Sequence, residues 1–381
     1  MSNRIKMFTR LGLSVLNNNI KKPIISSGTK TLYTASGLGI DEYKITRERV
    51  LVKYGSGADG FRKKMSDIVN NENSMVFSED LKNFGYMINN TPEELAVLSN
   101  LILKYNSQNS DFRFGVIRSG PIIMRALHYL NQPDVAFELF MNPNTDAFFN
   151  QITTFILLED LLYENKKYNQ VREVYNKIKL LLNNSVHPKL VAIIIMLSCY
   201  KENTPESFEY GLNIYREIIN KGNTPLKKIV SAIGALSLNQ KAPHITLEIL
   251  SQFSNQNYIS VKSLRLIALA ELGRLENIFV EFKFILQHEA KNNQLYKDVI
   301  PKIQETFKNG NLEPNPELLQ LLEKLQFGGY ISDLTLDEHL TMPIELQPKD
   351  KKKSRLLKSQ LADYDDESDN WGPKSYIKHN N

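Results

Sequence analysis

A pair of helices that recurs about every 35 residues constrains the fold of this 381-residue chain more than any other feature. Five segments place a small or apolar anchor residue at their third position, followed by apolar residues at helical spacing. The anchors are Ala136, Val171, Gly211, Thr246 and Ile278, which are separated by 35, 40, 35 and 32 residues. One such pair cannot bury its apolar face alone, so we predict that the pairs stack into an elongated α-solenoid over residues 78–290.

The first helix of each predicted pair lies just before its anchor. These first helices are expected over residues 121–130, 155–163, 191–200, 228–238 and 261–272. Hydrophobic residues make up 42% of the chain and glycine only 18 positions, which favours a large helical core over strand-rich folds. The irregular steps leave open a non-repetitive helical domain. A tetratricopeptide array fits the period, but its Trp/Gly/Tyr and closing Pro signature is absent.

The first forty residues have the composition of a targeting leader. Residues 1–40 contain six basic residues, no acidic residue and nine Ser or Thr. Apolar residues interrupted by Thr9, Arg10, Gly12 and Ser14 form one face of a short basic helix, which indicates a mitochondrial transit peptide rather than a secretory signal. A basic N-terminus of a cytosolic protein remains the alternative. Without this leader, 41 basic residues face 42 acidic ones, so the formal charge of +5 becomes −1.

Residues 41–77 are expected to form a linker and a leading helix. They contain Gly55-Ser56-Gly57-Ala58-Asp59-Gly60, which matches the G-x-G-x-x-G fingerprint of dinucleotide-binding folds. That fingerprint requires further alternation of strands and helices, whereas the chain is helical in pattern from residue 78 onward. We therefore interpret the glycines as a loop before a helix.

The C-terminal part divides into a helical cap and a charged tail. Asn315 and Pro316 predict a helix start, and Gly328-Gly329 predicts its end, within a cap over residues 291–345. Residues 346–381 hold a lysine-rich run followed by an acidic run, and such charge-segregated segments are usually disordered. The basic half of this tail is a candidate for contact with RNA or anionic lipid.

Several segments resemble the mitochondrial pentatricopeptide repeat-containing protein 2 family over roughly residues 40–340. The repeat-like segments are Asp134–Phe140 and Asn165–Ile178. The other landmarks, which occur in the family's order, are Phe112–Gly115, Gly120-Pro121, Phe148–Ile178, Cys199–Lys201, Thr204–Phe208 and Ala235–Gln240. Lys166 and Val171 depart from the turn glycine and small anchor usual in such repeats.

This resemblance implies a right-handed α-solenoid of degenerate pentatricopeptide-type helix-turn-helix repeats in the mitochondrial matrix. It also implies a role in mitochondrial RNA maturation or processing that supports respiratory-chain function, with RNA or RNA-processing proteins as partners. The rival hypothesis is a protein–protein scaffold in respiratory-chain or ribosome assembly that does not contact RNA. The transcript, the protein partners and the oligomeric state are not predicted, and no membrane span is expected because no stretch is long and apolar enough.

Base-specific reading of RNA is not expected, because the repeat positions that would face bases are apolar. In pentatricopeptide arrays, polar side chains of the first helix read one base per repeat. The corresponding positions here are Ile122, Leu157, Ala232 and Leu264, preceded three residues earlier by Ser119, Thr154, Ile229 and Val261. Binding through phosphates remains open for six basic residues near first helices: Arg118, Arg125, Lys227, Lys228, Lys262 and Arg265.

No catalytic, cofactor or metal site is predicted. The six histidines are scattered without H-x-x-x-H spacing, and the single cysteine excludes a disulfide or a Cys-based zinc site. Cys199 follows the apolar run 193–197, which favours a buried and unreactive thiol. We therefore expect a protein that is not an enzyme.

Overall fold

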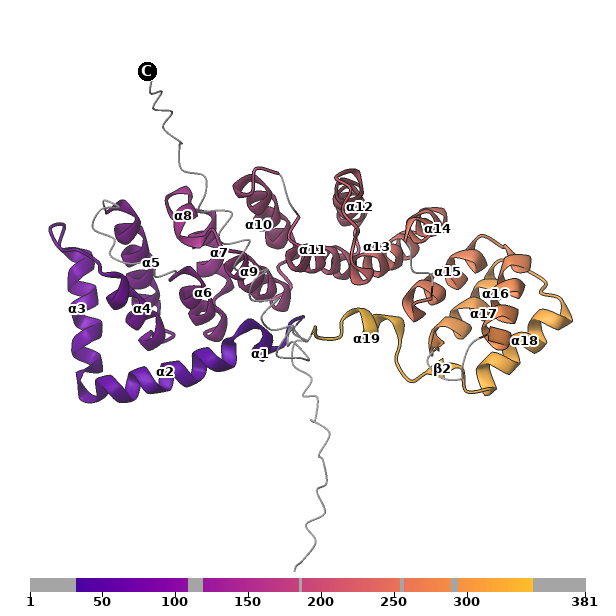
Figure 1. Cartoon of the computed structure of the whole chain (residues 1–381), viewed down its shortest axis with the longest axis horizontal. Coiled ribbons are helices and arrows are strands. Elements are labelled where there is room, and N and C mark those ends of the chain that lie inside the picture. Colours follow the sequence, from indigo (N-terminus) through magenta and orange to yellow (C-terminus); the bar gives the residue numbers. More distant parts are fainter. Residues whose placement is uncertain (1–31, 109–118, 185–186, 254–256, 289–293, 345–381) are drawn as a thin grey trace, which may run out of the picture.

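The chain is a curved stack of paired helices. The computed structural model describes residues 32–108, 119–184, 187–253, 257–288 and 294–344 (Figure 1). The first helices of successive pairs are α4 (Ser78–Met87), α6 (Gly120–Tyr129), α9 (Ile152–Glu164), α11 (Lys189–Glu202), α13 (Lys227–Asn239) and α15 (Ile259–Glu271). The second helices are α5 (Pro92–Ser107), α7 (Pro133–Met141), α10 (Tyr168–Leu181), α12 (Pro205–Asn220), α14 (Pro243–Gln252) and α16 (Leu275–His288). The predicted helical repeat solenoid is confirmed.

The first helices form a continuous inner layer, because each one packs on the first helix of the next pair. The residues of α11 from Val191 to Cys199 and those of α13 from Ile229 to Leu238 are buried on every side. Such helices are apolar all round because other elements cover all their faces. The second helices are amphipathic and pack against the first helices of their own and neighbouring pairs. All five anchor residues predicted from the repeat are buried.

The tight turn within a pair places residues other than glycine in the left-handed conformation. Asn131, Lys166, Lys241 and Gly273 occupy the same turn position in four pairs, with φ between 51° and 66°. At Lys166, the amide of the next residue donates to the Leu162 carbonyl at 2.9 Å, which closes the helix end in a Schellman-type turn. Lys166, which stands where glycine is usual, therefore adopts the left-handed conformation at some cost in backbone strain.

The leading region is more helical than predicted. α1 (Ala35–Leu38) and α2 (Ile40–Tyr54) precede a single 3-10 turn, Gly55–Gly57, and α3 (Ala58–Asn70). The residues before the glycines thus form a helix rather than a strand, so the dinucleotide interpretation fails structurally as well. Where we expected a linker and one leading helix, two long helices pack against α4 and α5.

The C-terminal cap adds helices and one small sheet that the sequence pattern did not indicate. It contains α17 (Val299–Asn309), α18 (Pro316–Phe327) and α19 (Leu336–Leu340), and the predicted Asn315 cap accepts from the Leu318 amide at 2.8 Å. β1 (Leu295–Tyr296) pairs in parallel with β2 (Ile331–Ser332), with Leu295 opposite Ile331. A short η3 turn (Pro143–Thr145) and α8 (Asp146–Phe149) lie between α7 and α9.

Both ends of the described chain meet on one side of the array. We call the side formed by α9, α11, α13 and α15 the inner face; α1 and α19 lie there, opposite α10, α12 and α14 (Figure 1). Tyr33 and Ile344 form a parallel bridge, in which the Ile344 amide donates to the Leu32 carbonyl at 2.8 Å. The Tyr33 hydroxyl donates to the Leu190 carbonyl at 2.8 Å, so this pair of end segments is attached to the repeats.

The structure describes only the last part of the predicted leader and none of the predicted tail. Residues 1–31 of the expected leader and the expected tail over residues 346–381 lie outside the described residues. The last part of the expected leader lies within the described residues, and its Leu32 and Tyr33 are fully buried. No helix within the described ranges is long and apolar enough to span a membrane.

Candidate functional site

The five described residues among the six predicted to contact RNA do not form one surface. Arg118 lies outside the described residues. Arg125 donates from Nε to the Leu38 carbonyl at 2.9 Å, and burial lowers the pKa of its guanidinium. It therefore attaches α1 to α6.

Two of the remaining residues are also engaged within the fold. Lys262 is buried, and its Nζ lies 3.5 Å from the Gln294 side-chain oxygen. Arg265 pairs with Glu281 at 3.1 Å between Nη1 and Oε1. Their charges are thus compensated or covered inside the molecule, which makes them poor candidates for phosphate contacts.

Lys227 and Lys228 are brought together at the start of α13. Lys227 is exposed, and its Nζ lies 4.6 Å from the centre of the Tyr258 ring. Lys228 is half-buried, and its Nζ donates to the Met342 carbonyl at 2.6 Å. A cation, an aromatic face and a second cation are therefore adjacent on the inner face.

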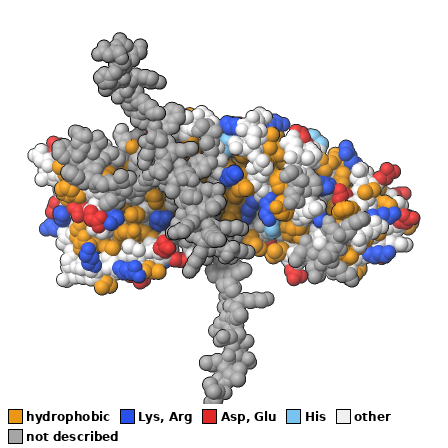
Figure 2. Space-filling model, in the orientation of Figure 1, with side chains coloured by type: hydrophobic (Ala, Val, Ile, Leu, Met, Phe, Trp, Pro, Cys, Tyr) orange, Lys and Arg blue, Asp and Glu red, His pale blue; other side chains and the backbone are white. Residues whose placement is uncertain are grey.

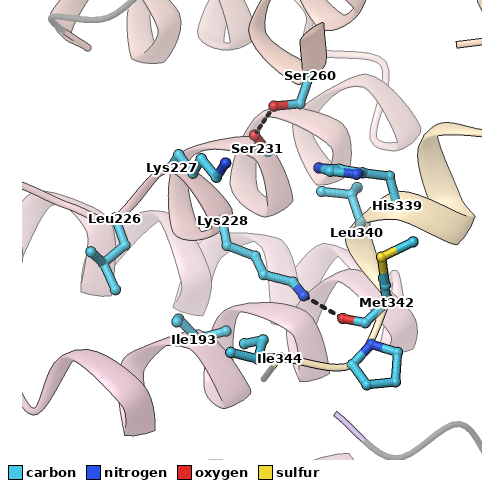
Figure 3. A pocket seen from close by; sticks show the side chains of 11 residues that line it. Ile193, Leu226, Lys227, Lys228, Ser231, Ser260, His339, Leu340, Met342 and Ile344 are labelled. Carbon is cyan, nitrogen blue, oxygen red and sulfur yellow. Dashed lines mark hydrogen bonds between the residues drawn. The ribbon is translucent and has the colours of Figure 1, made fainter. Parts of the chain in front are cut away.

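A pocket of about 330 Å³ lies beside these lysines (Figure 3). Its walls come from α11, α13 and α15 on one side and from the segment around α19 on the other. The lining residues are Ile193, Leu226, Lys227, Lys228, Ser231, Ser260, His339, Leu340, Met342, Pro343 and Ile344. Figure 3 shows His339 and Leu340 facing α13, and Ser231 donates to Ser260 at 2.9 Å. The pocket is largely apolar, with its positive charge on one wall.

The electrostatics of this site follow from burial and from like charge. Burial first, and the neighbouring charge of Lys227 second, lower the pKa of Lys228 to about 8. Burial and the charges of Lys228 and Lys227 also lower the pKa of His339. At neutral pH the site therefore holds two ammonium groups and a neutral imidazole, an arrangement that attracts anions such as phosphate.

The segment over residues 335–344, which we call the C-terminal strap, covers this part of the inner face. Asp337 accepts from Lys201 at 2.7 Å and from the Tyr200 hydroxyl at 3.1 Å. The Leu336 amide donates to Asp298 at 2.9 Å, and Leu336 and Leu340 are buried. Its helix starts with a Thr335–Glu338 capping box, a sequence signal from which the start of α19 could have been predicted.

Most of the positions that would read bases are buried. Leu157, Ala232 and Leu264 have no exposed surface, and Ile122 is only partly exposed. The four residues three positions before them, Ser119, Thr154, Ile229 and Val261, are at most 2% exposed. Most of these side chains cannot reach a base because they are buried. Burial excludes base reading more firmly than the apolar character of the principal positions does.

The single cysteine does not line the lysine pocket. Cys199 is buried, as predicted, and burial raises the pKa of its thiol to about 12. A thiol with this pKa carries almost no thiolate near neutral pH, so it is unreactive.

Curated relatives are similar to the chain over most of its length. It is 26% identical over 300 residues to pentatricopeptide repeat-containing protein 2, mitochondrial, of Mus musculus, an alignment that covers 76% of this chain and 75% of that protein. The protein of the same name from Homo sapiens is 26% identical over 270 residues, 70% of this chain and 68% of that one. The one from Danio rerio is 25% identical over 308 residues, 77% and 80% of the two chains.

No protein-family model matches the chain. The similarity to these relatives nevertheless extends over about three quarters of the chain. The comparisons therefore confirm the resemblance of this chain to the mitochondrial pentatricopeptide repeat-containing protein 2 family.

Proposed function

We propose that this protein is a non-catalytic factor in mitochondrial RNA maturation or processing that supports respiratory-chain function. The names of its relatives indicate a mitochondrial protein with repeats of an RNA-associated class. The observation that carries the proposal is the placement of Lys227 beside the Tyr258 ring and next to Lys228 on the inner face. Ammonium groups bind phosphates and an aromatic ring stacks on any base, so binding is tolerant of sequence.

Binding of purified full-length protein to labelled single-stranded RNA tests this proposal. We expect fluorescence anisotropy to report binding that weakens steeply between about 50 and 200 mM salt, because phosphate contacts release counterions. Two RNAs of equal length and different sequence are expected to bind within about threefold of each other, because stacking and phosphate contacts do not distinguish bases. Failure to bind either RNA at low salt would contradict direct contact, and a strong preference for one sequence would contradict sequence-tolerant binding.

A scaffold without RNA contact is the second candidate function. Side chains at most first-helix reading positions are buried, and apolar side chains are exposed elsewhere: Val280 on α16 is 64% exposed and Phe327 at the end of α18 is 81% exposed. Hydrophobic side chains reach the surface at several places on the molecule (Figure 2). Exposed apolar residues of this kind suit a protein partner. Recovery of stable protein complexes whose composition does not change after ribonuclease treatment, together with no RNA binding, would favour this candidate.

We further propose import into the mitochondrial matrix with removal of the leader before Leu32. Leu32 and Tyr33 are fully buried, and the Tyr33 amide donates to Asp160 at 3.3 Å, so a cut after these residues would remove part of the fold. N-terminal sequencing of the protein from purified mitochondria is expected to give a first residue at or before Leu32. A first residue at or after Tyr33 would contradict this placement, and a cytosolic location of a reporter fused to residues 1–31 would contradict import.

A further inference from the structure

Three potential metal ligands meet where two neighbouring helices end. His128 lies in the last turn of α6, and Asp160 and Glu164 lie one turn apart in the last part of α9. One ligand atom of each side chain lies within 4.8 Å of the other two. Among the described residues, this is the single group of three His, Cys, Asp or Glu side chains with that geometry.

The central ligand is already oriented. The Asp160 side chain has no exposed surface, and its Oδ2 lies 3.0 Å from His128 Nε2. Its other oxygen, Oδ1, accepts the backbone amide of Tyr33 at 3.3 Å. An outer hydrogen bond of this type fixes the direction of a carboxylate ligand, as second-shell bonds do in known metal sites.

Glu164 supplies an oxygen that has no hydrogen-bond partner among the described residues. Its Oε1 is shielded from solvent and makes no hydrogen bond in the described structure. Within the described ranges, Asp160 pairs with His128, and no lysine or arginine pairs with either carboxylate. Two facing carboxylates with one imidazole therefore leave negative charge that needs a cation or a proton.

The helix ends add to the negative potential at this group. The last carbonyl groups of a helix carry partial negative charge, and here the C-terminal turns of α6 and α9 lie side by side. The donor set of one imidazole nitrogen and two carboxylate oxygens suits Zn²⁺, whereas Mg²⁺ prefers an all-oxygen octahedral set. With metal–ligand bonds of about 2.0–2.2 Å, tetrahedral ligand atoms lie about 3.3–3.6 Å apart, so a small movement of the Glu164 carboxylate closes the site.

We propose that His128, Asp160 and Glu164 bind one divalent cation of the zinc class, with water at the fourth position. The ion joins α6 to α9 and holds Asp160 under the N-terminal segment through the Tyr33 amide. Its role is structural, because it links two repeats and the start of the described fold. The site has no H-x-x-x-H spacing because its ligands come from two repeats, with His128 and Asp160 separated by 32 residues, close to the repeat period.

Calorimetric titration of full-length, chelator-treated protein with Zn²⁺ tests the site. We expect one equivalent to bind at micromolar or lower concentration, together with a higher melting temperature and slower hydrogen exchange at the Tyr33 amide. His128→Gln and Glu164→Gln are each expected to weaken this binding at least tenfold. Glu164→Gln changes a partly exposed residue at a helix end, so it preserves the fold even where a change at buried Asp160 does not.

The double variant His244→Gln/Glu206→Gln is the matched control, since it removes the same residue types from exposed positions at the starts of α14 and α12. It is expected to bind Zn²⁺ as the unmodified protein does. Absence of Zn²⁺ binding, or binding that survives both His128→Gln and Glu164→Gln, would overturn the proposal. Equal affinity for Mg²⁺ would overturn the assignment to the zinc class.

Discussion

Replacing both Lys227 and Lys228 with glutamate is expected to weaken RNA binding by full-length protein at least tenfold. The change reverses two charges at the one place where the predicted basic residues meet on the inner face. Because each lost phosphate contact with single-stranded RNA lowers the salt slope by about 0.7, the slope of the double variant is expected to fall by about 1.4. Anisotropy titrations over a salt series measure both quantities.

The control for this variant is Lys308→Glu/Lys324→Glu, which makes the same change in net charge at exposed positions on α17 and α18. It is expected to bind RNA within about twofold of the unmodified protein, because distant surface charges are screened at physiological salt. Equal weakening by the two double variants would show that net charge, rather than the lysine pair, determines binding.

The lowered pKa of Lys228 gives this experiment a second readout. An ammonium group is charged below its pKa, so Lys228, with a pKa of about 8, loses its charge between pH 7 and 9, whereas an ordinary lysine keeps it. RNA binding is therefore expected to weaken over this interval. Lys228→Arg is expected to remove the weakening, since arginine stays charged, and an unchanged pH profile in that variant would exclude Lys228 as the titrating group.

Replacing Leu336 and Leu340 with alanine is expected to release the C-terminal strap and, with it, the N-terminal segment. Leu336 and Leu340 are 4% and 1% exposed. Removing a buried leucine side chain costs about 2–5 kcal/mol, so the double variant is expected to lose at least about 3 kcal/mol of unfolding free energy. Chemical denaturation measures this loss, and hydrogen exchange locates it.

The pattern of hydrogen exchange distinguishes a local packing defect from coupling between the C-terminal strap and the N-terminal segment. Because the Ile344 amide donates to the Leu32 carbonyl, loss of the strap is expected to speed exchange at residues 32–34 as well as at the start of α13. Leu180→Ala/Leu319→Ala is the matched control; these leucines are 69% and 44% exposed, so their removal is expected to change stability by less than about 1 kcal/mol. Unchanged protection at residues 32–34 in the strap variant would contradict the coupling.

The repeat array was predictable because its determinants are local and periodic. Ala136, Val171 and the other anchors recur at a spacing that requires neighbouring pairs to stack, and the Asn315 cap marks a helix start without tertiary information. The turn at Lys166 shows the limit of such rules: the backbone adopts the left-handed conformation that glycine favours, with lysine present.

The covering of the inner face was not predictable, because it depends on contacts between distant parts of the chain. Tyr33 bonds to Asp160 and Leu190, and Lys228 bonds to Met342, across sequence separations of 114 to 157 residues. For the same reason, the exposure of Lys227 and the burial of Lys262 could not be distinguished from the sequence. Proximity to a first helix identifies basic residues but not the direction of their side chains.

Ultraviolet crosslinking in intact mitochondria tests direct RNA contact most directly. Mitochondria isolated from cells that express either the full-length chain or its Lys227→Glu/Lys228→Glu variant are irradiated, and RNA bound to the purified protein is compared with a matched control. We expect RNA recovery above the control for the unmodified chain, a large loss in the variant, and crosslinked peptides that contain Tyr258, the ring next to Lys227. Recovery of protein partners without RNA above the control would contradict it.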